Sequence, residues 1–416
     1  MKKMAVLLAL FFFLLDIQSQ DTLRISLEKL LQEVKTNYPS IVQYQYNIQS
    51  LESKAQGATA WMPPTFTAGL MRFPYDFSTL NDKDDPMNQA GIAFSLEQMI
   101  PNPGKLKARK RYISSLTEIE KNNSAWTLNT LWREAKILYY NRYVNEKKLR
   151  VLQESEALLR LLLTTAEAKF SNNQSELQTI YKAKARIAEL NNMSLMLNSQ
   201  IVESNIGLNI LMVRDVYTPF GIDTMIVPRD YANTLVDTSR IVSRSDINRL
   251  TNSIQSMRLE QEAMSIGNRP DFGVRAEREQ MFGMPDQWSV MGMVTIPIVP
   301  WSSKMFSSET QSIGFQIEAM EQERLTMELM AKRMLAEKHS MLKYETTQYE
   351  NYRKEIIPAY ENNLQANLLA YRQNTGDFFV LLDAWEMLLM KKTELYDMLF
   401  NILKSETEYE YEREIR

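Results

Sequence analysis

Two long stretches of this chain are almost free of glycine and proline, and this distribution limits its fold more than any other feature. Residues 105–205 contain neither residue, and residues 301–374 contain only Gly314 and Pro358. Because glycine and proline are the main interrupters of helices, such stretches predict long helices. A helix over residues 105–170 would be about 100 Å long, at about 1.5 Å per residue. The sequence therefore predicts an elongated, mainly α-helical chain.

Composition excludes several classes of protein. The chain has 48 basic and 51 acidic side chains, which argues against general nucleic-acid binding. It has no cysteine and one histidine, His339, so disulfides, zinc–thiolate sites and most triad chemistry are excluded. We interpret His339 as a solvated helix position, and the carboxylate pair Glu406 and Glu410 as solvated surface without a catalytic partner. We expect no enzyme activity, no cofactor and no metal-dependent catalysis.

Residues 1–20 have the layout of a cleaved signal peptide. Lys2 and Lys3 precede an apolar run over residues 4–15, and a short polar stretch follows. An N-terminal membrane anchor is the alternative, but the run is short for a membrane span and Asp16 follows it. No later segment has 18 consecutive apolar residues, so a membrane-spanning part would have to consist of strands.

The same order of elements occurs twice along the chain. Each copy contains a helix, a pair of extended segments, a long helix, a turn and a returning helix. Similar segments precede the two long helices: Ile100-Pro101-Asn102-Pro103-Gly104-Lys105 and Val299-Pro300-Trp301-Ser302-Ser303-Lys304. We expect one structural repeat over residues 21–211, a linker over residues 212–244, and a second repeat over residues 245–416.

The four extended segments have the length and pattern of membrane-crossing strands. They cover residues 65–73, 90–100, 271–281 and 288–298, and a tilted strand needs about 9–11 residues to cross a bilayer. Alternate positions are apolar in the first three, and the fourth alternates less clearly. The residues expected to face the membrane are Phe66, Leu70, Ile92, Phe94, Leu96, Phe272 and Val274. Four strands cannot close alone, and an open edge in lipid leaves amide groups unpaired, so closure requires several chains. Three copies would supply twelve strands.

Several segments resemble one known family. They are Tyr38-Pro39-Ser40, Arg269-Pro270-Asp271, the paired segments at Pro101 and Pro300, and the pattern from Tyr371 through Leu381-Leu382-Asp383-Ala384. In this order the chain resembles the TolC-like outer membrane factors, the exit ducts of tripartite efflux pumps and type I secretion systems. The resemblance covers nearly the whole mature chain. Unlike lipidated members of that family, the chain has no N-terminal cysteine.

The resemblance implies a fold, a location and partners. The fold would be mixed and mainly α: long coiled-coil helices form a trimeric α-barrel that continues into a twelve-stranded transmembrane β-barrel, with four strands per chain. The homotrimer would sit in the outer-membrane lipid of a Gram-negative bacterium, with a long periplasmic portion. A periplasmic adaptor and an inner-membrane pump of the RND or ABC type would complete the system. The duct would be passive and would export small molecules, metal ions or proteins. An exported periplasmic coiled-coil scaffold or adhesin is the alternative function.

The resemblance also implies roles for residues at the helix turns. The adaptor-contact tip would include Asn172 and Asn173 of the first repeat, with Asn374, Thr375 and Gly376 of the second. For the pore gate the candidates are Asp383, Val380 and Lys182. Three symmetry-related copies of Asp383 would form a carboxylate ring, and such rings attract cations. Alternatively, Asp383 pairs with a lysine such as Lys182 and does not line the pore.

The 25 methionines and one basic cluster allow two interpretations each. Thioethers are soft ligands for Cu(I) or Ag(I), and Met281, Met284, Met291 and Met293 are the better candidates, but packing is the alternative. The seven-residue spacing of Met320, Met327, Met334 and Met341 favours a helical packing stripe. The basic cluster Lys105, Lys107, Arg109, Lys110 and Arg111 either touches anionic lipid headgroups or is a solvated helix start.

Overall fold

The computed structural model describes residues 24–81, 89–171, 177–231, 233–234, 238–282, 284–297 and 299–415. The expected signal peptide, residues 1–20, lies outside this range. The chain divides into two compact units. The helical unit comprises Met1–Ile41, Thr127–Thr238 and Lys332–Arg416, and the sheet unit comprises Val42–Trp126 and Ser239–Ala331. Each unit contains segments of both expected repeats.

The long helices predicted from the glycine and proline distribution are present. Helix α4 covers Pro103–Ser171, which is 69 residues, and α5 covers Leu177–Leu211. The first helical segment is divided at Pro39: α2 is Leu27–Asn37 and α3 is Pro39–Gly57. In the second half, α6 is Ser245–Ile266, α7 is Pro300–Asn351, α8 is Ile357–Arg372 and α9 is Phe378–Arg413. There are also two short 3-10 turns, η1 over Phe77–Asn81 and η2 over Ser239–Ser243.

The second long helix is not continuous to Asn374, contrary to expectation. A π-helical turn, η3, covers Tyr352–Ile356 between α7 and α8. Pro358 stands at the start of α8, has no backbone N–H, and its ring would crowd the carbonyl of Lys354 one turn earlier. The wider π turn relieves this crowding while the chain stays helical.

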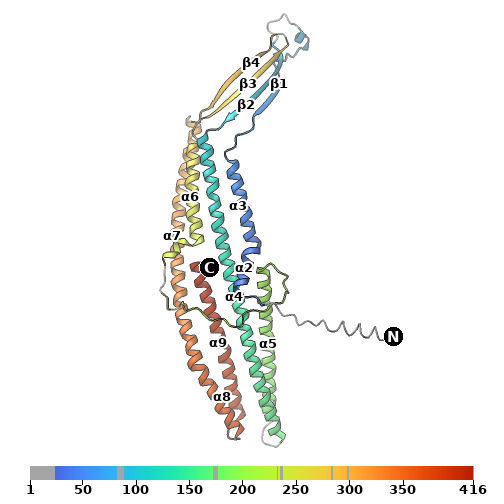
Figure 1. Cartoon of the computed structure of the whole chain (residues 1–416), viewed down its shortest axis with the longest axis vertical. Helices are drawn as coiled ribbons and strands as arrows, with labels where there is room; N and C mark the ends of the chain where they lie inside the picture. The colour runs from blue at the N-terminus through green and yellow to red at the C-terminus, as the bar shows by residue number, and fades with distance from the viewer. Residues whose placement is uncertain are drawn as a thin grey trace, which may run out of the picture. The chain divides into compact units, whose positions relative to one another are not determined.

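One antiparallel sheet forms in the sheet unit, with the strand order β1-β2-β3-β4 (Figure 1). Its strands are β1 Thr65–Met71, β2 Gly91–Ile100, β3 Asp271–Met281 and β4 Gln287–Thr295. The pairing of β2 with β3 joins the hairpins of the two repeats. Strand β4 ends three residues earlier than expected, because Pro297 cannot donate a ladder hydrogen bond.

Each unit has its own apolar core. In the helical unit, one cluster surrounds Trp385 and contains residues of α4, α5, α8 and α9. A second cluster of that unit surrounds Tyr139 and includes Leu30 of α2 and Leu208 of α5. In the sheet unit, Ile254 of α6 packs with Ile313 and Ile317 of α7. Among the described residues, no helix combines the length and apolarity that a membrane span requires.

Candidate functional site

The sheet has one apolar face, and all seven residues expected to face the membrane lie on it. Phe66 pairs in register with Leu96, and Leu70 with Ile92, so these side chains share a face. The pairing of β2 with β3 places Phe272 and Val274 on the same side. Six of the seven are exposed, with Phe66 at 66% and Leu70 at 70%, while Ile92 is half-buried. Strand β4 contributes Trp288, Val290 and Val294 to this face. Its alternation is weak in the sequence because Met291 and Met293, which are also apolar, point to the opposite face. Contact of this face with lipid stays a prediction.

The opposite face of the sheet is polar. Register pairing places Glu97 of β2 beside Arg275 of β3, and Glu277 and Glu279 lie on the same side. The Arg275 Nη2 atom donates to Ser95 Oγ at 3.4 Å, and its Nε atom lies 3.9 Å from Glu277 Oε2. A sheet with one apolar and one charged face suits a boundary between lipid and water.

Strands β1 and β4 form the two edges of the sheet. Among the described residues, each is paired with a strand on one side only. The outward N–H and C=O groups of an edge strand can pair with another chain. The single chain therefore presents two strand edges and an exposed apolar face.

At the base of the sheet, the basic cluster of α4 is partly used in ion pairs. Lys105 Nζ lies 2.7 Å from Asp271 Oδ2, and Arg111 Nη2 lies 2.5 Å from Glu262 Oε1. Lys107, Arg109 and Lys110 are exposed. The described contacts thus assign two of the five basic residues a structural role within the sheet unit.

The turn between α8 and α9 caps the C-terminus of α8 with a specific hydrogen-bond pattern. Asn374 has a left-handed conformation with φ 57°. Its N–H donates to Tyr371 O at 3.2 Å, and the Thr375 N–H donates to Ala370 O at 3.0 Å. This is the Schellman arrangement, which satisfies the last carbonyls of a helix. A Cβ atom on Gly376 would lie 2.9 Å from Ala370 Cβ, so glycine fits where larger residues crowd. Asn172 and Asn173, expected in the matching turn, lie outside the described residues.

The candidate gate residues lie within the first two turns of α9 and α5. Asp383 is exposed, and Val380, one turn earlier, is 54% exposed. Lys182 Nζ lies over the ring of Phe379, 5.1 Å from its centroid. No ion pair of the described residues includes Asp383. The alternative pairing of Asp383 with Lys182 is therefore not formed within this chain.

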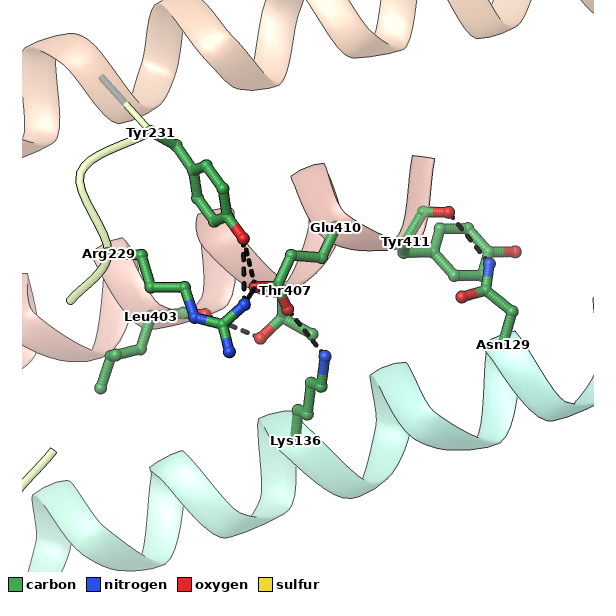
Figure 2. A network of polar contacts seen from close by, with 8 residues as sticks. All are labelled: Asn129, Lys136, Arg229, Tyr231, Leu403, Thr407, Glu410 and Tyr411. Atoms are coloured by element: carbon green, nitrogen blue, oxygen red, sulfur yellow. Dashed lines mark hydrogen bonds and ion pairs between the residues drawn. The ribbon is translucent and has the colours of Figure 1, made fainter. Parts of the chain in front are cut away.

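A buried network surrounds Glu410, so the prediction that this residue lies on the solvated surface is wrong (Figure 2). Arg229 Nη1 and the Tyr231 hydroxyl donate to Glu410 Oε1 at 2.7 and 2.8 Å. Lys136 Nζ donates to Glu410 Oε2 at 2.7 Å. Glu410 is only 5% exposed, because the linker residues 229–231 lie over this part of α9. One carboxylate thereby joins the linker, α4 and α9.

Glu406 is also buried, one turn before Glu410, and was misplaced for the same reason. It is 5% exposed, and its Oε1 atom has no hydrogen-bond partner among the described residues. Burial raises the pKa of Glu406 to about 8, and the nearby Glu410 charge acts in the same direction. His339, expected to be solvated, is half-buried: its Nε2 lies 2.8 Å from Thr234 O and its ring packs against Tyr409. No sequence motif marks these residues, since residues of the linker cover them.

Within the part of the chain that the structure describes, no group of three or more His, Cys, Asp or Glu side chains could hold a metal ion.

The fold is that of outer-membrane channel proteins. No protein-family model and no curated protein matches the chain. Solved structures match it at low sequence identity but over most of its length. CusC, described in terms of transmembrane channel formation, has a TM-score of 0.77, 12% identity, and covers 94% of this chain and 92% of its own.

Two further channels show the same likeness. VceC, an outer membrane protein of Vibrio cholerae, has a TM-score of 0.75 and 12% identity, covering 93% of this chain and 95% of its own. The CmeC outer membrane channel of Campylobacter jejuni has a TM-score of 0.74 and 12% identity, and the match covers 93% of this chain and 85% of CmeC. The expected resemblance to TolC-like outer membrane factors is confirmed at the level of fold.

Proposed function

We propose that this protein is the outer-membrane channel of a tripartite efflux or type I secretion system. The observation that carries this proposal is the four-stranded sheet, with an exposed apolar face, a charged opposite face and two unpaired edges. In a bilayer core those edges must be paired, because no water is present to satisfy them. An exported scaffold or adhesin would need the long helices but would have no use for such a sheet.

The edges would be paired by copies of the same chain. Strand β4 of one copy would add to β1 of the next, and three copies of four strands would close a twelve-stranded barrel. The apolar face would then contact outer-membrane lipid and the charged face would line the lumen. The long helices would form a periplasmic α-barrel, with residues 212–244 in an equatorial belt.

The duct would be passive, so the energy for export would come from other proteins. An inner-membrane pump of the RND or ABC type would supply it through a periplasmic adaptor. The adaptor would contact the helix turns, at Asn374, Thr375 and Gly376 and at the first-repeat residues Asn172 and Asn173. A cysteine introduced as Thr375→Cys should cross-link to the adaptor, whereas Ser289→Cys in β4 should not.

Asp383 would contribute a ring of three carboxylates at the periplasmic entrance. Its exposure, and the placement of Lys182 over Phe379, support a role in the pore over an ion pair within the chain. Val380 adds an apolar side chain one turn away on the same helix. The exported substrates would be small molecules, metal ions or proteins.

Fractionation of cells tests the proposal. The chain should be found in the outer membrane and should run as a trimer that resists mild heating in detergent. Recovery of the chain as a soluble periplasmic monomer would contradict the proposed duct function and would favour the scaffold or adhesin.

A further inference from the structure

All five methionines of the four strands lie on the charged face of the sheet. They are Met71, Met99, Met281, Met291 and Met293. The opposite face is built mainly from aromatic and aliphatic residues, with Gln98, Gln280 and Arg278 among them, and holds no strand methionine. A residue chosen only to fill apolar contact would be expected on the apolar face. The methionines instead share their face with Glu97, Glu277 and Glu279.

Two of these methionines meet over a glycine. In register, Met99 of β2 and Met293 of β4 flank Gly273 of β3. A Cβ atom on Gly273 would lie 2.7 Å from Met99 Sδ and 3.0 Å from Met293 Cε. Both thioether side chains therefore occupy the space that a side chain at Gly273 would fill. Met71 and Met281 flank Gly91 in the same way, but there the nearest atoms are backbone atoms of Gln280 and Met281.

A third methionine lies on the same face, with Arg275 of β3 as its register partner. Met291 is two residues before Met293 on β4 and so lies on the same face, about 7 Å along the strand. Its side chain is exposed, and methionine has three rotatable bonds, so its sulfur can turn toward Gly273. Glu97, Glu277 and Glu279 outnumber Arg275 on this face, and the excess negative charge raises the local concentration of cations.

We propose that Met99, Met291 and Met293 form a binding site for a soft monovalent cation, Cu(I) or Ag(I). Neutral thioethers bind such ions and discriminate against Mg²⁺, Ca²⁺ and Mn²⁺, which prefer oxygen. Gly273 is a positioning residue, because its missing side chain lets the sulfurs approach one another. The site lies within the sheet of one chain and does not depend on the duct. In a closed barrel it would face the lumen and would place soft metal ions among the exported substrates.

The competing explanation is that these methionines only fill space in the sheet. Substitution by leucine distinguishes this explanation from metal binding. Leucine fills a similar volume without sulfur, so the triple variant Met99→Leu, Met291→Leu, Met293→Leu keeps contact and removes the ligands. A matched control is Met257→Leu, Met264→Leu, Met320→Leu, since those methionines pack against the Ile254 cluster of α6 and α7.

The experiment titrates the detergent-solubilised full chain with Ag(I) in chloride-free buffer, by calorimetry, and with Cu(I) in competition with a chromophoric chelator. The parent and the control should bind one ion per chain. The triple variant should bind more than about tenfold more weakly, since even outer contacts to a metal ligand are worth about 10–100-fold. Gly273→Ala, which keeps every sulfur, should also weaken binding.

Two results would overturn the site: a parent protein that binds no Ag(I), or a triple variant of equal oligomeric state and melting temperature that binds like the parent. If the triple variant fails to fold, Gly273→Ala decides, and unchanged affinity in that variant counts against the site. A chain that binds Ag(I) through these residues but stays monomeric would contradict the duct and leave the site intact.

Discussion

Lys136 on α4 and Glu410 on α9 form an ion pair of 2.7 Å in which both side chains are nearly buried, at 12% and 7% exposure. Glu410 also accepts hydrogen bonds from Arg229 and Tyr231 of the linker. Three segments far apart in sequence therefore depend on one carboxylate. Arg229 is 64% exposed, but Lys136 is nearly buried, so removing this carboxylate would leave the Lys136 charge buried without a partner, which is costly.

We expect Glu410→Ala to destabilise the protein by about 3–5 kcal/mol, the usual cost of breaking a buried ion pair. Denaturant unfolding in detergent measures the change. Glu361→Ala is the matched control, because its pair with Lys392 is more exposed and should cost at most about 1 kcal/mol. Equal losses in the two variants would mean that the network around Glu410 does not stabilise the fold.

Glu406 should make stability depend on pH. Its pKa of about 8 in the folded protein is above the ordinary value of 4.5, so the folded state holds the proton more tightly. Its contribution is complete below about pH 4.5 and is lost as pH rises through about 8. We expect Glu406→Gln to melt at a higher temperature than the parent at pH 9, and near the parent at pH 4.5. A difference that does not change between these two pH values would contradict the buried, protonated carboxyl.

A charge on the apolar face of the sheet should impair membrane assembly. Leu96 has apolar register partners on both sides, Phe66 and Ala276. If it lies near the middle of the bilayer, Leu96→Arg should cost about 2–4 kcal/mol. The control Thr67→Arg places the same charge on the polar face of β1. The amount of heat-resistant oligomer in the outer membrane measures both, and normal assembly of Leu96→Arg would mean that this face does not meet lipid.

Asp383 should set ion preference if it lines the pore. Asp383→Asn removes one carboxylate per chain and should reduce cation selectivity in planar bilayers. Asp377→Asn is a useful comparison, because the Asp377 side chain caps α9 by accepting from the Phe379 N–H. Unchanged selectivity and conductance in Asp383→Asn would place this residue outside the pore.

Features set by local sequence were predictable, and features set by distant segments were not. The glycine-free stretch before Gly207 predicts a long helix, and alternation over residues 271–281 predicts β3. The burial of Glu406 and Glu410 depends on linker residues far earlier in the chain, such as Arg229, which precedes Glu410 by 181 positions. No local pattern records that contact.

The methionines illustrate the same limit within the sheet. Alternation along β4 already places Met291 and Met293 on one face. The convergence of Met99 and Met293 over Gly273 requires the register of three strands from both repeats. The π turn before Pro358 was predictable in principle, since an interior proline disturbs a helix, but its form depends on how the backbone relieves the crowding.

Pairing of β4 with β1 of a neighbouring copy is the central claim, and disulfide cross-linking in outer membranes tests it most directly. The chain has no cysteine, so any disulfide between copies must come from the introduced cysteines. Thr67→Cys combined in turn with Gln287→Cys, Ser289→Cys or Met291→Cys joins positions on the same face of the two edges. Thr67→Cys with Val290→Cys, on opposite faces, is the control. We predict reductant-sensitive covalent trimers for at least one same-face pair and none for the control. Monomers for every pair, in correctly folded protein, would contradict the trimeric duct.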